Sequence, residues 1–426
     1  MLAPYSTAAA GGQPGAGTAA TAGGEAVGTP GTTAAGAPDG RRPLLFLYGD
    51  TGAGHWTSAT AVAQAVEEAR GDEFRCEVRD GFAEFGPRVT ARALGLYAPA
   101  VRYAPWLYGA GWKLTDSRAA SRAFRATLLR RHEEALAAEL RRTRPAALVS
   151  FHPLLTDLCA RVVRRQDVPR IPVLGVVTDL VTIHASWFCP QLDAVLTSSA
   201  EGLARCHHFG IPATRCADLG LPVDRRFRSP IDPRVARRAL GLDVDRFTVV
   251  LSGGGEGSGG LHRRARALAA AGLDLQLVVV CGRNRRLRRR LEGIRPSGPA
   301  TLRVEGFVDD MPDWLSAADL VVSKAGPGTI AEAFCVGTPI LLTAYVPGQE
   351  RGNVDHVLRQ GAGRWVPRTA DLVEAVRELS VPGSPALTRL RGAVRAAARP
   401  DAADRIAGRI CDLAIAAAGA TAVRGG

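Results

Sequence analysis

Short apolar segments alternate with helix-like segments along most of this chain, and this alternation limits the possible folds more than any other feature. Their apolar residues follow one another without polar gaps, as in parallel strands that helices bury on both faces. Such β–α alternation is typical of doubly wound sheets. The sequence therefore predicts an α/β fold with two Rossmann-like domains. Its candidate strands form two series, Leu44–Tyr48, Cys76–Val78, Ala147–Phe151, Val173–Thr178 and Ala194–Ser198, then Thr248–Ser252, Leu275–Val280, Leu302–Glu305, Leu320–Ser323 and Ile340–Ala344.

Composition sets the expected domain boundaries. Residues 1–41 are mostly Gly, Ala, Thr and Pro, which bury too little surface to offset the entropy of ordering, so we expect a disordered tail. Gly, Pro and Asp gather between Gly220 and Pro230, where we expect the two domains to join. The predicted domains are residues 42–225 and 226–395, followed by a C-terminal helix and tail at 396–426.

The first candidate strand ends in a glycine-rich loop, Gly49–His55. Glycines after a strand let the backbone approach a phosphate or a sugar, and the next helix offers its N-terminal amides. The spacing from Gly49 to Gly54 matches a P-loop, but His55 stands where the catalytic lysine of that motif must be. The loop therefore argues against an ATPase.

A second glycine-rich loop opens the second series, and Gly255, Gly257 and Gly260 spell G-x-G-x-x-G. A dinucleotide site also needs an acidic residue after the next strand, to hold the ribose. Here that strand is followed by Cys281-Gly-Arg-Asn284. A dehydrogenase is therefore disfavoured, whereas phosphate binding remains open.

Two further loops follow buried strands of the second series. In Lys324–Ala333, the amides of a helix that starts near Thr329 could hold a diphosphate. Glu332 could accept hydrogen bonds from a ribose, or could merely complement the helix dipole. The polar residues of Pro347–Asn353 suit recognition of sugar hydroxyls, although alone they would be an ordinary solvated loop.

The overall composition further limits the type of protein that this chain can be. Eight scattered cysteines without a C-x-x-C pair indicate reduced thiols, and Cys206, His207, His208 and Cys216 fit no zinc spacing. No apolar run is long enough to span a bilayer, and no secretory signal precedes the first strand. The net charge of +13 favours polyanionic surfaces, either nucleic acid or an anionic leaflet. We expect a cytoplasmic protein.

In these motifs the chain resembles glycosyltransferase family 28, particularly its monogalactosyldiacylglycerol synthase-like branch. The resemblance runs from about residue 43 to 395, and its most specific part is Lys324–Glu332 with the following Pro347–Glu350. The matching segments, in chain order, are Gly49–His55, Phe151–Pro153, Val176–Asp179 with His184 and Trp187–Phe188, Gly253–Gly257, Cys281–Asn284, Gly306–Val308, Lys324–Glu332 and Pro347–Glu350.

The resemblance implies a GT-B fold, with the acceptor bound by the N-terminal domain and a UDP-sugar by the C-terminal one. Phe307 would lie beside uracil, Gly326–Thr329 would hold the diphosphate, Glu332 the ribose, and Gln349 and Glu350 the donor sugar. The full set of expected donor-binding residues is Gly254, Gly255, Glu256, Arg283, Phe307, Val308, Gly326, Pro327, Gly328, Thr329, Glu332, Gln349, Glu350 and Asn353.

The same resemblance places the general base at His55, with Asp179 near it. An imidazole can remove the proton of an acceptor hydroxyl as it attacks the sugar, which inverts the anomeric carbon. Amides stabilise the departing UDP, so no metal or other cofactor is expected. The one D-x-D, Asp243–Asp245, precedes a strand rather than following one, so we interpret it as solvated charge. The expected acceptor residues are Gly52, Gly54, His152, His184 and Trp187.

A lipid acceptor is favoured by the aromatic and basic stretch Arg102–Lys113, which includes Trp106, Tyr108 and Trp112. Trp and Tyr prefer the bilayer interface, and arginines such as those of 283–290 favour anionic headgroups. The same aromatic side chains could instead pack against the hydrophobic core of the N-terminal domain. We expect diacylglycerol as acceptor, at the inner face of the plasma membrane. The alternatives are N-acetylglucosamine transfer to a polyprenyl-linked precursor, a UDP-sugar epimerase, a non-catalytic lipid-surface protein and, remotely, a nucleic-acid-binding protein.

Overall fold

The structure is a computed structural model that describes residues 40–50, 53–87, 104–117 and 129–424. The internal contacts divide the chain into Met1–Gly40 and Arg41–Gly426, and both sheets belong to the second unit. Residues 1–39 of the expected tail, together with Gly52, Arg102 and Tyr103, lie outside the described residues.

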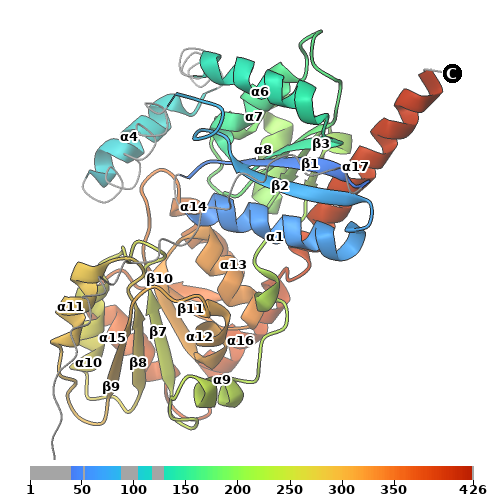
Figure 1. Ribbon diagram of the computed structural model, residues 1–426. Coiled ribbons are helices and arrows are strands. Elements are labelled where there is room, and N and C mark those ends of the chain that lie inside the picture. The colour runs from blue at the N-terminus through green and yellow to red at the C-terminus, as the bar shows by residue number, and fades with distance from the viewer. Residues whose placement is uncertain (1–39, 51–52, 88–103, 118–128, 425–426) are drawn as a thin grey trace, which may run out of the picture. The chain divides into compact units, whose positions relative to one another are not determined.

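The first sheet is parallel, with strand order β2-β1-β3-β4-β5-β6 (Figure 1). Its strands are β1 (Arg42–Tyr48), β2 (Phe74–Asp80), β3 (Ala147–Ser150), β4 (Val173–Val176), β5 (Ala194–Thr197) and β6 (Cys216–Asp218). The helices of this half are α1 (Ala53–Arg70), α4 (Pro105–Thr115), α6 (Arg130–Thr143), α7 (Pro153–Val162) and α8 (Ala200–His208).

The second sheet is also parallel, with strand order β12-β11-β10-β7-β8-β9. Its strands are β7 (Thr248–Ser252), β8 (Gln276–Val280), β9 (Thr301–Glu305), β10 (Leu320–Lys324), β11 (Ile340–Ala344) and β12 (Gly363–Trp365). Its helices are α9 (Pro233–Ala239), α10 (Leu261–Ala269), α11 (Arg285–Glu292), α12 (Met311–Ala317), α13 (Pro327–Val336), α14 (Arg351–Arg359), α15 (Thr369–Leu379) and α16 (Pro385–Ala397). The two doubly wound sheets predicted from the sequence are therefore confirmed.

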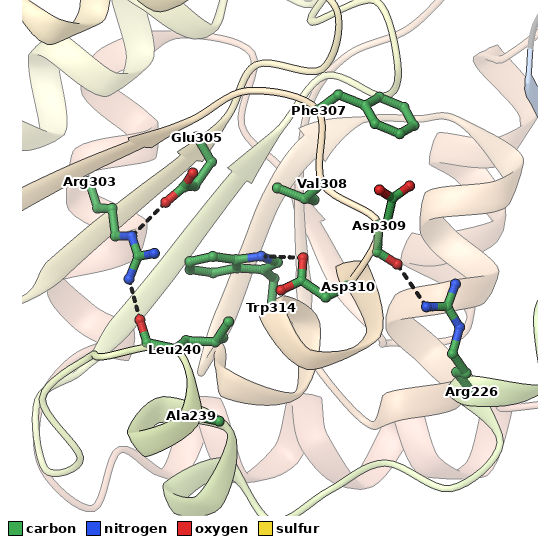
Figure 2. A pocket seen from close by; sticks show the side chains of 10 residues that line it. All are labelled: Arg226, Ala239, Leu240, Arg303, Glu305, Phe307, Val308, Asp309, Asp310 and Trp314. Carbon is green, nitrogen blue, oxygen red and sulfur yellow. Dashed lines mark hydrogen bonds and ion pairs between the residues drawn. The ribbon is translucent and has the colours of Figure 1, made fainter. Parts of the chain in front are cut away.

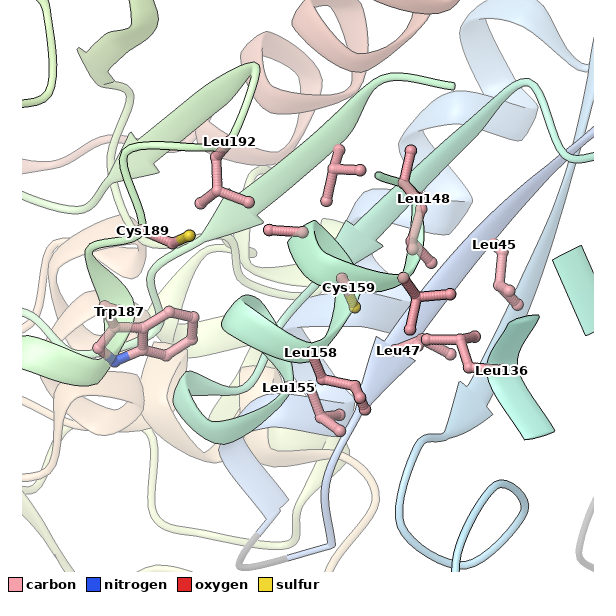
Figure 3. Close-up of a cluster of buried hydrophobic side chains, with 14 of the residues drawn as sticks. Leu45, Leu47, Leu136, Leu148, Leu155, Leu158, Cys159, Trp187, Cys189 and Leu192 are labelled. Atoms are coloured by element: carbon pink, nitrogen blue, oxygen red, sulfur yellow. The ribbon is translucent and has the colours of Figure 1, made fainter. Parts of the chain in front are cut away.

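Burial on both faces explains why the strands are continuously apolar. In β1, Leu45 and Leu47 pack with α6 and α7 on one face, and Leu44 and Phe46 pack with α1 on the other. Figure 3 shows the first of these clusters, in which Leu155 and Leu158 of α7 lie near strand β1. The second sheet repeats the pattern, with β7 residues alternating between two separate clusters. Because all positions of such a strand are buried, no polar alternation survives in the sequence.

The final helix, α17 (Ala402–Arg424), returns to the first sheet. Its Ile406 and Ile410 pack in the same cluster as Val62 and Val66 of α1, as Figure 1 shows for the two helices. The Arg42 side chain also donates a hydrogen bond of 2.8 Å to the Ala414 carbonyl. The chain thus runs from the first half to the second and then returns to the first. Helix α17 therefore belongs to the core of the first half.

Each sheet has one point at which its strand order reverses. In the first sheet this point lies between β1 and β3, and in the second it lies between β7 and β10. Loops that follow two such strands diverge to opposite faces of the sheet, which leaves a crevice where ligands bind. The glycine-rich loops after β1, β7 and β10 all follow strands at these two points, so the topology brings the predicted motifs to the expected crevices.

Candidate active site

His55 lies in the first turn of α1, at the crevice of the first sheet. Its Nδ1 is 2.7 Å from Thr178 Oγ1, and its ring centroid is 4.7 Å from that of His152, which follows β3. Gly49 makes this approach possible, because a Cβ there would lie 2.8 Å from His152 and 2.4 Å from Phe82. Burial lowers the pKa of His55 to about 4, although the Phe151 carbonyl opposes part of that shift. The imidazole is therefore neutral at pH 7 and able to accept a proton.

Asp179 is held by partners other than His55. Its Oδ2 accepts a hydrogen bond of 2.7 Å from the Trp187 indole, and its Oδ1 accepts one of 3.0 Å from the Gln349 amide. The pKa of Asp179 is raised to about 6, mainly by burial, which the two hydrogen bonds oppose and the charge of Glu350 reinforces. The neighbouring residue, Thr178, is the one that orients His55. Sequence reasoning did not assign it a role, although the Val176–Asp179 motif contains it.

The expected acceptor residues fall into buried and exposed groups. His152 is buried and caps α7 by accepting a hydrogen bond of 3.2 Å from the Leu154 amide. His184 is also buried, and its Nε2 is 3.2 Å from Thr115 Oγ1 of α4. Trp187 is fully buried, so it supports Asp179 rather than touching a membrane (Figure 3). Gly54 is exposed, and no other atom lies within 4 Å of the position that a Cβ would occupy there.

Trp56, one residue after the candidate base, has 49% of its surface exposed. Sequence reasoning did not single it out, although it follows directly on the Gly49–His55 motif. An exposed indole next to the base could contact an apolar acceptor. This position is therefore an additional acceptor-side candidate.

The loop after β7 folds tightly onto the turn after β8. Gly254 and Gly257 have positive φ angles, and a Cβ at Gly257 would lie 2.3 Å from the Cys281 carbonyl. The Arg283 amide donates a hydrogen bond of 2.8 Å to the Gly255 carbonyl. Glu256 is exposed at the tip of this loop. The glycines thus serve a close backbone contact, which shapes the rim of the second crevice.

Helix α13 starts directly after β10 with an uncapped N-terminus. Gly326 is the N-cap, Pro327 occupies the first turn, and no side chain caps the helix. The amides of Gly328 and Thr329 belong to that first turn, where an α-helix has no internal acceptor for them. Such an end attracts an anion through its amides and its dipole. The helix start at Gly326–Thr329 is therefore suited to an anion, and its binding of a diphosphate stays a prediction.

Glu332 lies one turn into α13, and no described residue donates a hydrogen bond to its carboxylate. Desolvation and, to a smaller extent, the nearby Asp224 together raise the pKa of Glu332 to about 7. Glu332 remains partly exposed, so a bound ligand can reach its carboxylate. Ribose hydroxyls that donate to it would offset the cost of its partial desolvation, which a purely dipolar role would leave in place.

The other expected sugar-binding residues are partly engaged within the protein. Glu350 is buried, forms an ion pair with Lys324, and accepts a hydrogen bond of 2.8 Å from the Val346 amide. The Asn353 amide donates to the Ala325 carbonyl at 2.8 Å, which fixes the turn before α13. Gln349 connects the same loop to Asp179. Lys324, which had no assigned role, therefore positions Glu350 beside the diphosphate loop.

Phe307 follows β9 and is 52% exposed, with the Arg283 guanidinium 4.7 Å from its ring centroid. Phe307 and Val308 also line an open pocket of about 620 Å³ (Figure 2). Four of its polar side chains are paired with one another, Arg303 with Glu305 and Trp314 with Asp310. Since β9 is an edge strand, this pocket flanks the sheet and lies away from the strand-order reversal between β7 and β10. Of the two places, the crevice at the reversal suits a diphosphate better.

No described helix is both long and apolar enough to cross a bilayer. Within the described part of the chain, no three His, Cys, Asp or Glu side chains are grouped to hold a metal ion. Asp245 of the D-x-D forms an ion pair with Arg234.

Comparison with known proteins adds independent evidence. The family model for monogalactosyldiacylglycerol (MGDG) synthase matches residues 55–223, and that for the glycosyltransferase family 28 C-terminal domain matches residues 248–406. A probable chloroplastic monogalactosyldiacylglycerol synthase of Glycine max is 33% identical over 386 residues, which cover 86% of this chain and 71% of that protein. The chloroplastic monogalactosyldiacylglycerol synthase 1 of Arabidopsis thaliana is 32% identical over 384 residues, covering 86% of this chain and 70% of that protein.

Among solved structures, MurG of Acinetobacter baumannii resembles this chain with a TM-score of 0.58 and 17% identity, over 87% of this chain and 99% of that one. At this identity the likeness shows the fold alone, and it confirms the GT-B architecture. The sequence relatives and the order of the motifs go further. The chain is a glycosyltransferase and belongs to the monogalactosyldiacylglycerol synthase branch of glycosyltransferase family 28.

Proposed function

We propose that this protein transfers galactose from UDP-galactose to diacylglycerol at a bilayer surface, with inversion of the anomeric carbon and with His55 as general base. The observation that carries the proposal is the neutral His55, which Thr178 holds at the crevice of the first sheet. The names of the relatives supply the sugar and the lipid. N-acetylglucosamine transfer and epimerisation share the fold, but no feature of this site favours them.

In the proposed reaction, Nδ1–H of His55 donates to Thr178 Oγ1, and Nε2 accepts the proton of the acceptor hydroxyl. The hydroxyl oxygen bonds to C1 of the sugar as the bond from C1 to the UDP oxygen breaks. Negative charge then develops on the diphosphate, where the first-turn amides of α13 stabilise it. Glu332 accepts hydrogen bonds from the ribose, and Arg283 and Phe307 lie beside the base. The residues therefore supply each role without a metal ion in the proposed scheme.

Helix α4 is the proposed contact with the bilayer. Trp106, Leu107 and Leu114 are 73%, 57% and 81% exposed, and Lys113 is exposed on the same face. This combination of an indole, leucines and a cation is typical of segments that lie in the membrane interface. Such an arrangement would let the acceptor reach His55 without leaving the lipid phase.

Helix α11 supplies a second candidate contact, through charge. Arg285, Arg286, Arg289 and Arg290 are exposed, and no described acidic residue pairs with them. Each basic residue near an anionic leaflet contributes about 1 kcal/mol of attraction. The patch therefore favours anionic lipids over neutral ones. The relatives are named as chloroplastic proteins, whereas for this chain we propose the inner face of the plasma membrane as the anionic surface.

The test is to incubate the protein with vesicles that contain diacylglycerol and an anionic lipid, and separately with UDP-galactose, UDP-glucose or UDP-N-acetylglucosamine. We expect a galactosyl lipid with UDP-galactose, in which NMR shows the β-anomer formed from the α-linked donor. His55→Ala should abolish turnover and retain UDP binding. Transfer of another sugar would correct the donor, and full activity of His55→Ala would contradict the base assignment.

A further inference from the structure

Helix α4 has two faces, of which only one is exposed. The exposed face carries Trp106, Leu107, Ala110, Lys113 and Leu114, which recur at helical spacing. The opposite face carries Tyr108, Gly109, Trp112 and Thr115, which are better covered or hydrogen-bonded. One side of the same short helix is therefore available to a bilayer while the other is engaged with the protein.

The engaged face packs on the loop Pro347–Glu350 of the second half. A Cβ at Gly109 would lie 2.9 Å from Pro347 Cβ, so the helix backbone rests directly on that proline. Gly348 has a φ of +85°, and a Cβ there would lie 3.1 Å from the Trp112 side chain. The Tyr108 hydroxyl donates a hydrogen bond of 3.2 Å to Gln349 Oε1. Three consecutive loop residues thus contact one helix.

The same loop is part of the donor side of the site. Glu350 forms an ion pair with Lys324, and a Cβ at Gly326, the N-cap of α13, would lie 2.9 Å from Lys324 Nζ. Gln349 also donates to Asp179, which holds Trp187, and the Trp187 ring centroid is 6.3 Å from that of His55. A shift of this loop would therefore act on both the diphosphate end of α13 and the surroundings of the base.

Helix α4 is poorly stabilised by itself. It has 11 residues, two internal glycines and no side-chain cap at Ala104. Isolated helices of this length are marginal in water, and glycine lowers their stability further. Its conformation must therefore depend on what packs against its faces. A bilayer that covers the exposed face would favour the helix, and with it the contacts of the engaged face.

We propose that α4 couples bilayer contact to donor binding, so that seating the helix on an anionic membrane tightens the binding of the UDP-sugar. This inference rests on the proposed function and adds a regulation of the same site. Coupling between two binding events is reciprocal, so UDP-sugar should tighten membrane binding by the same factor. Tyr108 acts here as a positioning residue, because it contacts Gln349 rather than the reacting atoms.

The experiment measures the affinity for UDP-galactose by calorimetry, with and without vesicles of phosphatidylglycerol and phosphatidylcholine that lack diacylglycerol. Without an acceptor no transfer occurs, so the result does not depend on the lipid product. We expect the vesicles to lower the Kd for UDP-galactose by about fivefold or more. UDP-galactose should lower the Kd for vesicles, measured by flotation, by the same factor.

Two variants locate the coupling. Tyr108→Phe removes one hydroxyl from the engaged face, so vesicle affinity should stay the same while the effect of vesicles on the donor Kd falls below about twofold. Gly109→Val, which forces α4 away from Pro347, should lose the coupling by an independent route. Trp106→Ala should weaken vesicle binding itself.

Three outcomes would overturn the inference. Vesicle binding that leaves the donor Kd unchanged would remove the coupling, while the synthesis of a galactolipid would still stand as a separate result. Coupling that persists in both Tyr108→Phe and Gly109→Val would show that α4 is not the route. Absence of vesicle binding, or association of two chains through the exposed face in sedimentation, would reject the bilayer as its occupant.

Discussion

At the scale of single residues, the orientation of the proposed base His55 depends on the hydroxyl of Thr178. Thr178 is a hydrogen-bond partner of His55 at 2.7 Å, so Thr178→Val should leave the imidazole neutral but without this orienting contact. Loss of one orienting hydrogen bond is worth about 1 kcal/mol, so we expect kcat to fall about fivefold with little change in KM for the UDP-sugar. Thr178→Ser, which keeps the hydroxyl, is the matched control and should recover most of the rate. Equal rates for the Val and Ser variants would contradict this role.

Glu332 gives the site a pH dependence whose sign follows from its environment. Its pKa is about 7 in the unliganded protein, because burial disfavours the charged form. Ribose hydroxyls that donate to the carboxylate would lower that pKa, so binding should be tightest above pH 7 and weaken as the pH falls below it. The change should approach tenfold per pH unit at most. Calorimetry between pH 6 and 8 with a UDP-sugar, rather than UDP, avoids a titrating phosphate on the ligand.

Glu332→Gln is the control for this titration. The amide carries no charge at any of these pH values, so the variant should bind the UDP-sugar more weakly at pH 8 and without the pH slope. If wild type and variant show the same slope, another group is responsible. Asp179, whose pKa is about 6, is then the next candidate, because it also contacts the donor loop through Gln349.

At the scale of elements, the arginines of α11 test whether the location of the positive charge matters for membrane binding, or only the net charge. Replacing Arg286, Arg289 and Arg290 by Gln should weaken binding to anionic vesicles, by about 1 kcal/mol for each arginine close to the lipid. The matched control replaces Arg364, Arg368 and Arg377, which pair with Glu378, Asp371 and Glu374. Both sets change the net charge equally, so an equal loss in flotation assays would show that only net charge matters. Salt should reduce the difference.

The strands predicted from the sequence agree best with the structure for the long buried strands and least for two short strands at the edges of the sheets. All ten predicted strands are present, and the two that sequence reasoning missed, β6 and β12, are three-residue edge strands without an apolar run. Both strands are three residues long and mostly only half-buried, so burial leaves little trace in their composition. The glycine-rich loops could be recognised in the sequence because glycine marks backbone conformations that other residues avoid, as at Gly257, whose φ is +56°.

Partners that are far apart in the sequence were less predictable. The bond from Gln349 to Asp179 spans 170 residues, and the contact of His55 with Thr178 spans 123. No local pattern records such a pairing, which explains why Asp179 was placed near the base and Gln349 with the sugar. The aromatic stretch shows the same limit, because periodicity alone could not tell exposed Trp106 from Trp112, which packs on Gly348.

At the scale of the whole molecule, α17 makes the stability of the first half depend on the end of the chain. Ile410 is fully buried against α1, so Ile410→Ala should leave a cavity and cost about 2–4 kcal/mol. Ile415 lies on the same helix but is 38% exposed, and Ile415→Ala should cost much less. In urea unfolding followed by fluorescence, the first half of Ile410→Ala should unfold at a lower urea concentration than that of the wild type. Added UDP-sugar should stabilise this transition less than the transition that unfolds the second sheet. Similar shifts for both variants would mean that α17 is not part of the first core.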